Sequence, residues 1–270
     1  MSLTLPAPAH QSATAPRAPR FTDLLRSEWA KLRTVRTTVW CLVATVLLVV
    51  GGAVLVAVKA RTQGPQAIDV TVNFSRVGLM IGQLAVIVLA VTAIGSEYST
   101  GTIRVSLTAA PWRTRWLAAK TVTVAALGLV TGTVLSIVCF ALVYLCAPAV
   151  SGSLMTPGVI RAVLGAGPYL CVLSVLSLAV GAVLRSTVGA IIAMFTLVYV
   201  VPGVVAGSPL RELERFLPAG ILPPNAGWTI MQVDPGRLGG LPPWAGFAVL
   251  CTWAAVAMAG AACLLQTRDA

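Results

Sequence analysis

The chain has 270 residues, of which 57% are hydrophobic and 10% are charged, with a formal net charge of +11. Soluble domains hold about a quarter charged residues, so this composition excludes a water-soluble enzyme and indicates a membrane protein. The excess positive charge is divided among the edges of apolar stretches. This distribution suits anionic lipid headgroups and argues against a nucleic-acid binder, which would gather basic residues on one soluble face.

Residues 1–20 are rich in Pro, Ala, Ser and Thr. They lack the apolar core of a secretory signal, so we expect a disordered tail. Residues 21–270 are expected to form one transmembrane domain, and the loops between its apolar stretches are too short for a separate soluble domain.

The segment Phe21–Arg36 has helical periodicity, with its apolar residues on one arc. We predict an amphipathic helix along the inner membrane surface, with Trp29 at headgroup depth. Glu28 lies inside the apolar arc. Either it snorkels or pairs with Lys31, three residues on, or this face meets protein and Glu28 accepts a hydrogen bond there. The apolar arc consists of Phe21, Leu24, Leu25, Trp29, Leu32 and Val35.

Six stretches follow that contain no Asp, Glu, Lys, Arg or His. Each is long enough to cross about 30 Å of hydrocarbon as a helix, so the predicted fold is an all-α, polytopic membrane protein with six transmembrane helices. Because nothing ionisable lies within these stretches, we expect no proton or charged solute to be handled in the bilayer. The stretches are Val39–Val58, Val77–Gly95, Thr121–Ala147, Ala162–Leu184, Ser186–Ala206 and Pro243–Leu265.

An even number of spans places both ends of the chain on one side of the membrane. That side carries more Lys and Arg than the other, and a basic cluster directly precedes the first span. The positive-inside rule therefore predicts that both termini are cytoplasmic.

The inner loop Ser96–Lys120 carries helix signals of its own. Ser96 can cap a short helix with Glu97 in its first turn, and Gly101 leaves a spot where another backbone can approach. Pro111 suits the first turn of the next helix. The loop is either an ordinary connection with membrane anchors or a docking surface. The expected interfacial collar comprises Trp112, Arg113, Arg115, Trp116 and Lys120.

Three further features concern helix packing. Arg185 is the only charge between the fourth and fifth spans and predicts a tight hairpin. The proline-rich outer loop Gly207–Pro242 either dips back against the bundle as a re-entrant cap or is solvated. Glycine pairs at i,i+4, such as Gly78/Gly82 and Gly128/Gly132, are weak evidence for helix dimerisation because chance produces about two of them.

Several kinds of chemistry are absent from the sequence. No GxxxxGK[ST] phosphate loop is present, so the chain does not bind ATP in that way. The single histidine, His10, lies in the tail, and no G-x-S-x-G motif occurs. We therefore expect no enzyme, no metal site and no cofactor, and we interpret the six cysteines as small packing residues.

The pattern resembles the integral-membrane subunit of ABC-2-type (type V) ABC exporters of actinobacteria. Four stretches carry the resemblance: LLRSEWAKLRTVRTTVW (Leu24–Trp40), GSEYSTGTIRVSL (Gly95–Leu107), LRSTVGA (Leu184–Ala190) and FLPAGILPPNAGW (Phe216–Trp228). The segment AGILPPN departs from the family by being longer and richer in proline.

The resemblance implies an amino-terminal connecting helix, a coupling helix after the second span and outer re-entrant helices before the last. It also implies two partners, a separate ABC ATPase subunit and a second permease subunit in a homo- or heterodimer. The residues that match the ATPase-coupling segment are Glu97, Tyr98, Ser99, Gly101, Thr102 and Arg104. Those that match the connecting helix are Glu28, Trp29 and Lys31.

Two other functions stay open from the sequence. The chain can be a membrane anchor or sensor that recruits a soluble partner without moving solute, or an ion-coupled carrier that uses Ser, Thr and backbone oxygens. An uncharged pathway suits lipidic or amphiphilic cargo, but the sequence does not identify a substrate.

Overall fold

The computed structural model describes residues 20–62, 66–102, 113–147, 150–207, 221–233 and 241–267. Apart from Arg20, the predicted amino-terminal tail lies outside these ranges, as do Arg104, Pro111 and Trp112. Among the described residues the chain is almost entirely helical. One parallel pair of two-residue strands joins β1 (Gln66–Ala67) to β2 (Val150–Ser151).

Within the described ranges, six helical segments are long and apolar enough to cross a membrane, which confirms the prediction of six spans. The six segments are Arg36–Lys59, Ile68–Ser99, Arg113–Cys146, Pro157–Leu184, Thr187–Val205 and Pro243–Thr267. The elements within them are α2 (Arg36–Thr62), α3 (Ile68–Ser75), α4 (Val77–Ser99), α6 (Arg113–Cys146), α7 (Pro157–Leu164), α8 (Ala166–Leu184), α9 (Thr187–Phe195), the π-helical turn η1 (Thr196–Val200), α10 (Val201–Gly207) and α13 (Pro243–Thr267).

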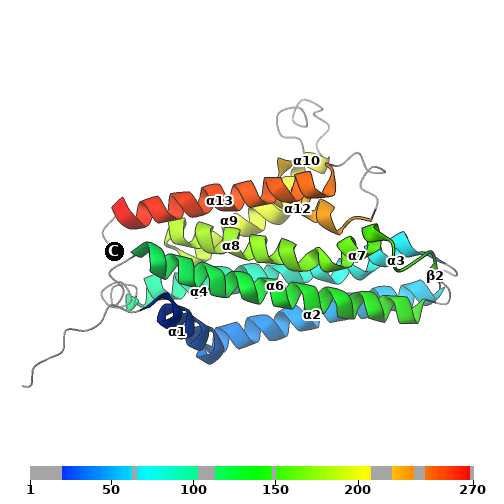
Figure 1. Cartoon of the computed structure of the whole chain (residues 1–270), viewed down its shortest axis with the longest axis horizontal. Helices are drawn as coiled ribbons and strands as arrows, with labels where there is room; N and C mark the ends of the chain where they lie inside the picture. Colours follow the sequence, from blue (N-terminus) through cyan, green and yellow to red (C-terminus); the bar gives the residue numbers. More distant parts are fainter. Residues whose placement is uncertain are drawn as a thin grey trace, which may run out of the picture.

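The spans lie side by side along the long axis of the molecule (Figure 1). The spans that contain α4 and α8 form the centre, because 61% of each hydrophobic window is buried, against 22–33% in the other four. α4 packs against α2 and α8, and α8 packs against α6 and α13. Tyr169, Leu170 and Leu173 of α8 are completely buried in this core.

Glycines let the central helices approach their neighbours closely. A Cβ atom at Gly78 would lie 2.0 Å from the carbonyl oxygen of Val49 on α2. One at Gly132 would lie 2.7 Å from the carbonyl oxygen of Ala166, at the start of α8. Small residues permit such backbone contacts in membrane bundles. Two of the glycine pairs therefore serve the packing of helices within one chain: Gly78/Gly82 and Gly128/Gly132. Their spacing in the sequence indicates helix dimerisation only weakly.

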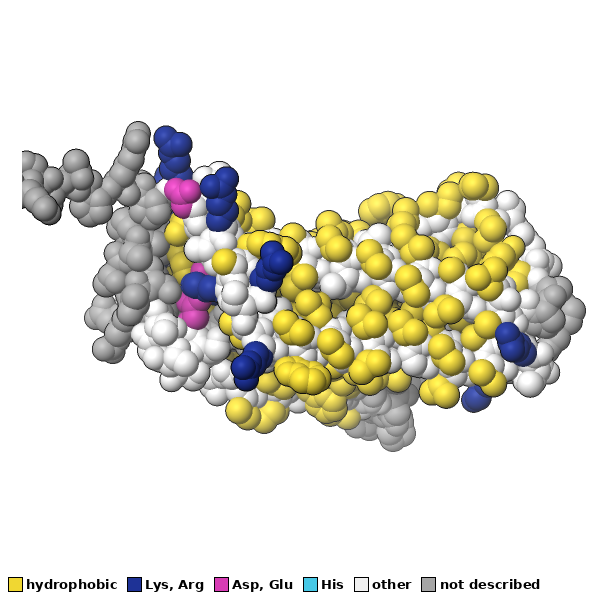
Figure 2. Space-filling view, turned by 90° about the horizontal axis from the view of Figure 1, so that it is seen from below, with side chains coloured by type: hydrophobic (Ala, Val, Ile, Leu, Met, Phe, Trp, Pro, Cys, Tyr) yellow, Lys and Arg dark blue, Asp and Glu magenta, His cyan; other side chains and the backbone are white. Residues whose placement is uncertain are grey.

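The first helix, α1 (Phe21–Thr34), lies at the same end of the bundle as the carboxyl end of α13 (Figure 1). We call this the α1 end. Figure 2 shows a face on which hydrophobic side chains cover the middle of the long axis, while Lys and Arg lie toward the two ends. Such a belt suits a lipid bilayer flanked by water.

The opposite end carries α3, α7 and the segment before the last span. That segment contains α12 (Pro223–Trp228) and the 3-10 turn η3 (Thr229–Met231). Both pack against α13, and Leu222, Ile230 and Met231 are buried. The prediction that this loop packs back against the bundle is confirmed for residues 221–233, which we call the re-entrant segment.

The hairpin between the fourth and fifth spans is as tight as predicted. α8 ends at Leu184 and α9 begins at Thr187. Arg185 has φ +53°, a left-handed conformation that reverses the chain. The Ser186 hydroxyl accepts a hydrogen bond from the Gly189 amide at 3.2 Å and caps α9.

Candidate functional site

Three helices bring four charged residues together at the α1 end. Glu28 and Lys31 lie on α1, Glu97 lies in the last turn of α4, and Lys120 lies in the amino-terminal part of α6. The prediction that Ser96 caps a new helix is wrong, because α4 continues without a break through Ser99. α4 ends where Gly101 adopts φ +69°, a conformation that glycine accepts without strain.

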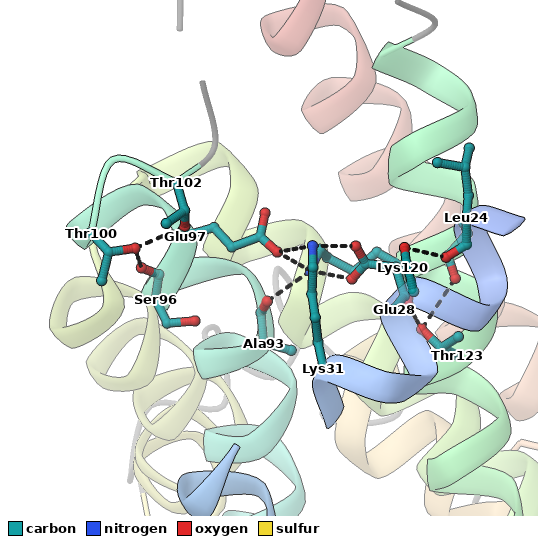
Figure 3. A network of polar contacts seen from close by, with 12 residues as sticks. Leu24, Glu28, Lys31, Ala93, Ser96, Glu97, Thr100, Thr102, Lys120 and Thr123 are labelled. Carbon is teal, nitrogen blue, oxygen red and sulfur yellow. Dashed lines mark hydrogen bonds and ion pairs between the residues drawn. The ribbon is translucent and has the colours of Figure 1, made fainter. Parts of the chain in front are cut away.

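Each carboxylate contacts both lysines (Figure 3). Glu28 Oε1 lies 2.6 Å from Lys31 Nζ, and Glu28 Oε2 lies 2.7 Å from Lys120 Nζ. Glu97 Oε1 lies 2.9 Å from both ammonium groups. We call Glu28, Lys31, Glu97 and Lys120 the ion-pair network. It joins α1, α4 and α6 through side chains that are 66 and 92 positions apart in the sequence.

Most of the network is buried. Glu28, Glu97 and Lys120 are 2%, 7% and 3% exposed. An isolated buried charge is costly, but two carboxylates and two ammonium groups balance one another here. Lys120 also donates to the Ala93 carbonyl at 3.0 Å, and its Nζ lies 5.3 Å from the centre of the Trp116 ring. These contacts offset the free-energy cost of removing the lysine ammonium group from water.

The α1 side of the network keeps both of its groups charged. Burial raises the pKa of the Glu28 carboxyl. The charges and hydrogen bonds of Lys120 and Lys31 lower it by a larger amount, so the pKa lies below its ordinary value. Burial lowers the pKa of Lys31, while hydrogen bonds and charges from Glu28 and Glu97 raise it by more, so the pKa lies above its ordinary value. The contacts thus favour the ionised forms near neutral pH.

Glu97 occupies a helix position that disfavours it when it is alone. A carboxylate in the last turn of a helix meets the negative end of the helix dipole. Lys31 and Lys120 offset this repulsion, so the end of α4 depends on cations that other helices supply. Among the described residues, Glu97 Oε2 is buried without a hydrogen-bond partner. The carboxylate is therefore held through its other oxygen.

A pocket of about 510 Å³ adjoins the network. Its walls come from α1, α2, α4, α6 and α9, and many of its side chains carry hydroxyl groups. The hydroxyl residues are Thr37, Thr38, Thr92, Ser96, Ser99, Thr100, Thr102, Thr123 and Thr187. All four network residues also line it.

The structure brings three of the predicted site residues together: Glu28, Lys31 and Glu97. Of the two interpretations of Glu28, the pairing with Lys31 and the contact with protein are both correct. Trp29 lies outside the ion-pair network and is 51% exposed. The guanidinium of Arg185 lies 5.6 Å from the centre of the Tyr98 ring, and Ser99 and Thr102 line the pocket. Gly101 has open space around it, and Arg104 lies outside the described residues.

Sequence reasoning missed the central member of the network. Lys120 and Trp116 were assigned to an interfacial collar, but they are 3% and 2% exposed. One signal could have found Lys120. Glu28 and Glu97 both adjoin apolar surfaces and need cations, and Lys120 is the lysine that directly precedes the third apolar stretch.

The helices that contain the second and third apolar stretches extend beyond those stretches, and the added turns carry ionisable groups. Glu97 and Lys120 lie inside two of the spanning helices. Arg76, which directly precedes the second apolar stretch, lies between α3 and α4 in the second span and is 5% exposed. Among the described residues, no group of three or more His, Cys, Asp or Glu is placed to hold a metal ion.

Comparison with known families decides the identity of the fold. Residues 24–203, two-thirds of the chain, match the family model described as "ABC-2 family transporter protein". The chain belongs to this family. The ABC-2 match spans α1 to α10 and includes all four residues of the ion-pair network. No match was found among curated proteins.

Family membership confirms the resemblance to ABC-2-type permeases drawn from the sequence. The ABC-2 protein is a multi-pass membrane component of an ABC transporter, a permease. The family consists of transporter membrane components and is not a catalytic one. A permease of this kind implies a transport system with an ATPase partner.

Proposed function

We propose that this permease is the membrane-spanning subunit of an ATP-driven exporter, energised by a separate ATPase subunit. In this proposal the α1 end faces the cytoplasm, in the cell membrane, and receives the partner. The permease works as a dimer with a second permease subunit, identical or different. The basic residues at the α1 end and the ABC-2 match support this orientation.

The ion-pair network is the observation that carries the proposal. Lys120 and Lys31 connect the last turn of α4, which leads into the loop before α6, to α1. A push on that loop would reach α1 and α6 through short, buried, charge-assisted hydrogen bonds. Packed helices move as rigid bodies, so the push would rock the bundle instead of bending one helix.

The proposed roles follow from the contacts. Glu97 transmits the movement of the coupling segment, with Tyr98, Ser99, Gly101, Thr102 and Arg104 forming the surface that meets the ATPase. Glu28 and Lys31 transmit it to the connecting helix, and exposed Trp29 supports that helix from outside. Lys120 joins the coupling segment to the connecting helix through its contacts with Glu97 and Glu28.

Reconstitution with the ATPase partner tests the proposal. The partner is the phosphate-loop ATPase that co-purifies with the permease from its own cells. We expect vesicles holding both subunits to show ATPase activity that responds to a transported amphiphile. An anchor or sensor would bind the partner without this response, and an ion-coupled carrier would need a sodium gradient and no partner. Either result would contradict the proposal.

A matched pair of variants tests the network. Lys120→Met removes the central cation, and Lys59→Met removes an exposed lysine near the end of α2, at the opposite end of the bundle. We expect Lys120→Met to insert into the membrane and bind the partner but to lose the response of the ATPase to substrate. Lys59→Met should keep the response. Equal ATPase responses in the two variants would show that the ion-pair network takes no part in coupling.

A further inference from the structure

Two arginines, one on α7 and one between α3 and α4, hold the end of the re-entrant segment. Arg161 on α7 donates from Nη2 to the carbonyl oxygens of Gln232 and Val233, at 2.6 and 3.2 Å. Arg76, between α3 and α4, donates from Nη1 to the carbonyl oxygen of Met231. Three consecutive carbonyl groups thus accept from two guanidinium groups. Arg76 and Arg161 form what we call the arginine clamp.

The physical basis of the clamp is the end of a short helix. α12 and η3 run together from Pro223 to Met231. The last carbonyls of a helix have no partner within it. These carbonyls carry partial negative charge, which cations stabilise. The guanidinium of Arg76 also lies 6.0 Å from the centre of the Trp228 ring, on the same segment.

The segment covers a buried polar pair in the middle of the bundle. The Trp228 and Tyr169 rings meet edge to face, with centroids 5.8 Å apart. The Tyr169 hydroxyl donates to Gln83 Oε1 at 2.7 Å, and both residues are buried. Withdrawal of the re-entrant segment would remove Trp228 from Tyr169 and open a path toward this pair.

The clamp holds a buried cation without a carboxylate partner among the described residues. Arg76 is 5% exposed, and in the described part of the chain it forms no ion pair with a carboxylate. A buried cation that only carbonyls and a ring compensate has lost much of its hydration. When the segment withdraws, water reaches the guanidinium and offsets the broken hydrogen bonds. Hydration of Arg76 therefore lowers the free energy that release of the segment requires.

We propose that the arginine clamp is a releasable latch, and that the re-entrant segment is the gate it closes at the end of the bundle opposite α1. Arg76 and Arg161 are positioning residues that keep the gate on α8 and α13 until the bundle rocks. The latch itself lies within the permease and needs no partner subunit. Its use in transport rests on the proposed function.

Cysteine labelling of the purified permease tests the latch. Met231 is completely buried, and Met231→Cys keeps the backbone carbonyl that Arg76 contacts. The six native cysteines are first replaced by alanine, and a bulky hydrophilic maleimide then reports how often the segment leaves the bundle. Loss of one hydrogen bond to a charged group shifts an equilibrium by about tenfold or more. We expect Arg76→Met and Arg161→Met each to raise the labelling rate by about this factor.

Two controls separate the latch from general loosening. Lys59→Met removes an exposed cation at the same end and should leave the labelling rate unchanged. A cysteine at Leu250, completely buried on α13, should stay protected in the arginine variants. Arg161→Lys keeps the charge but replaces the planar guanidinium with a compact ammonium group, so it should label at an intermediate rate. Unchanged labelling in all the arginine variants, or a parallel rise at Leu250, would overturn the latch.

The ATPase partner distinguishes the latch from its use. In the reconstituted complex with the unaltered clamp, trapping the partner with nucleotide should raise labelling at position 231. If the arginine variants label as expected but nucleotide has no effect, the segment is a structural strap and the gate assignment is wrong. Failure of the proposed function would appear separately, as a permease that binds no ATPase at all.

Discussion

Lys120 on α6 donates a hydrogen bond to Glu28 on α1 across 2.7 Å, and both side chains are 3% exposed. The same ammonium group contacts Glu97, so one lysine connects three helices. Removing it leaves two buried carboxylates with only Lys31, whose side chain is 43% exposed.

We expect Lys120→Met to destabilise the permease by about 3–5 kcal/mol, the typical effect of leaving a buried charge without its partner. Thermal unfolding in detergent measures this, with Lys59→Met as the control that should change little. A melting temperature equal to that of the unaltered protein would show that the network contributes nothing to stability.

A double variant tests whether Glu28 and Lys120 act as a pair. Glu28→Gln with Lys120→Met removes one charge of each sign and leaves Glu97 with Lys31, which are 2.9 Å apart. The double variant should be less destabilised than the sum of the two single variants, by about 0.5–3 kcal/mol. Additive losses would mean that the two side chains do not interact.

The pH dependence of stability follows from the two shifted pKa values. The pKa of Glu28 is lowered in the folded state, so its contribution is present above about pH 4 and is lost as pH falls through the folded value. The pKa of Lys31 is raised, so its contribution is present below about pH 10 and is lost as pH rises through the folded value. The melting temperatures of Glu28→Gln and the unaltered protein should converge in acid, and those of Lys31→Met and the unaltered protein should converge in alkali. Differences that stay constant across these ranges would contradict the assignment.

The predicted elements succeeded where one local property decides the structure. An apolar stretch of sufficient length becomes a spanning helix, so all six spans were found, and the periodicity of Phe21–Arg36 gave α1. The buried charges depend instead on which helices pack together. Lys120 looks like a membrane anchor until α1 lies across α6, and Arg76 looks like a loop residue until the re-entrant segment covers it. Contacts over such separations leave no local pattern.

The continuity of α4 through Ser96 has a similar cause. A serine followed by an acidic residue is a common start of a helix, and here it lies inside the last turn of one. The cations that stabilise Glu97 in this position come from α1 and α6. Its place in the sequence therefore could not reveal the end of the helix.

Packing of α4 on α2 supplies a further prediction. Gly78→Ala would place its Cβ 2.0 Å from the Val49 carbonyl oxygen, a backbone atom that cannot move aside easily. We expect destabilisation by about 1–3 kcal/mol, the usual effect of overpacking. Gly203→Ala, with nothing within 4 Å of the new atom, is the matched control. Comparable melting temperatures for the two variants would contradict the close approach of α2 and α4.

The central claim is that a separate ATPase moves the permease from its α1 end through Glu97. Spin labels at Ala30 on α1 and Val188 on α9, both exposed, report that movement as an inter-label distance in the complex with its partner. We predict that nucleotide trapping shifts the distance distribution in the unaltered network and leaves it unshifted in Glu97→Gln, although the variant still binds the partner. The same shift in both proteins, or none in either, would contradict the account.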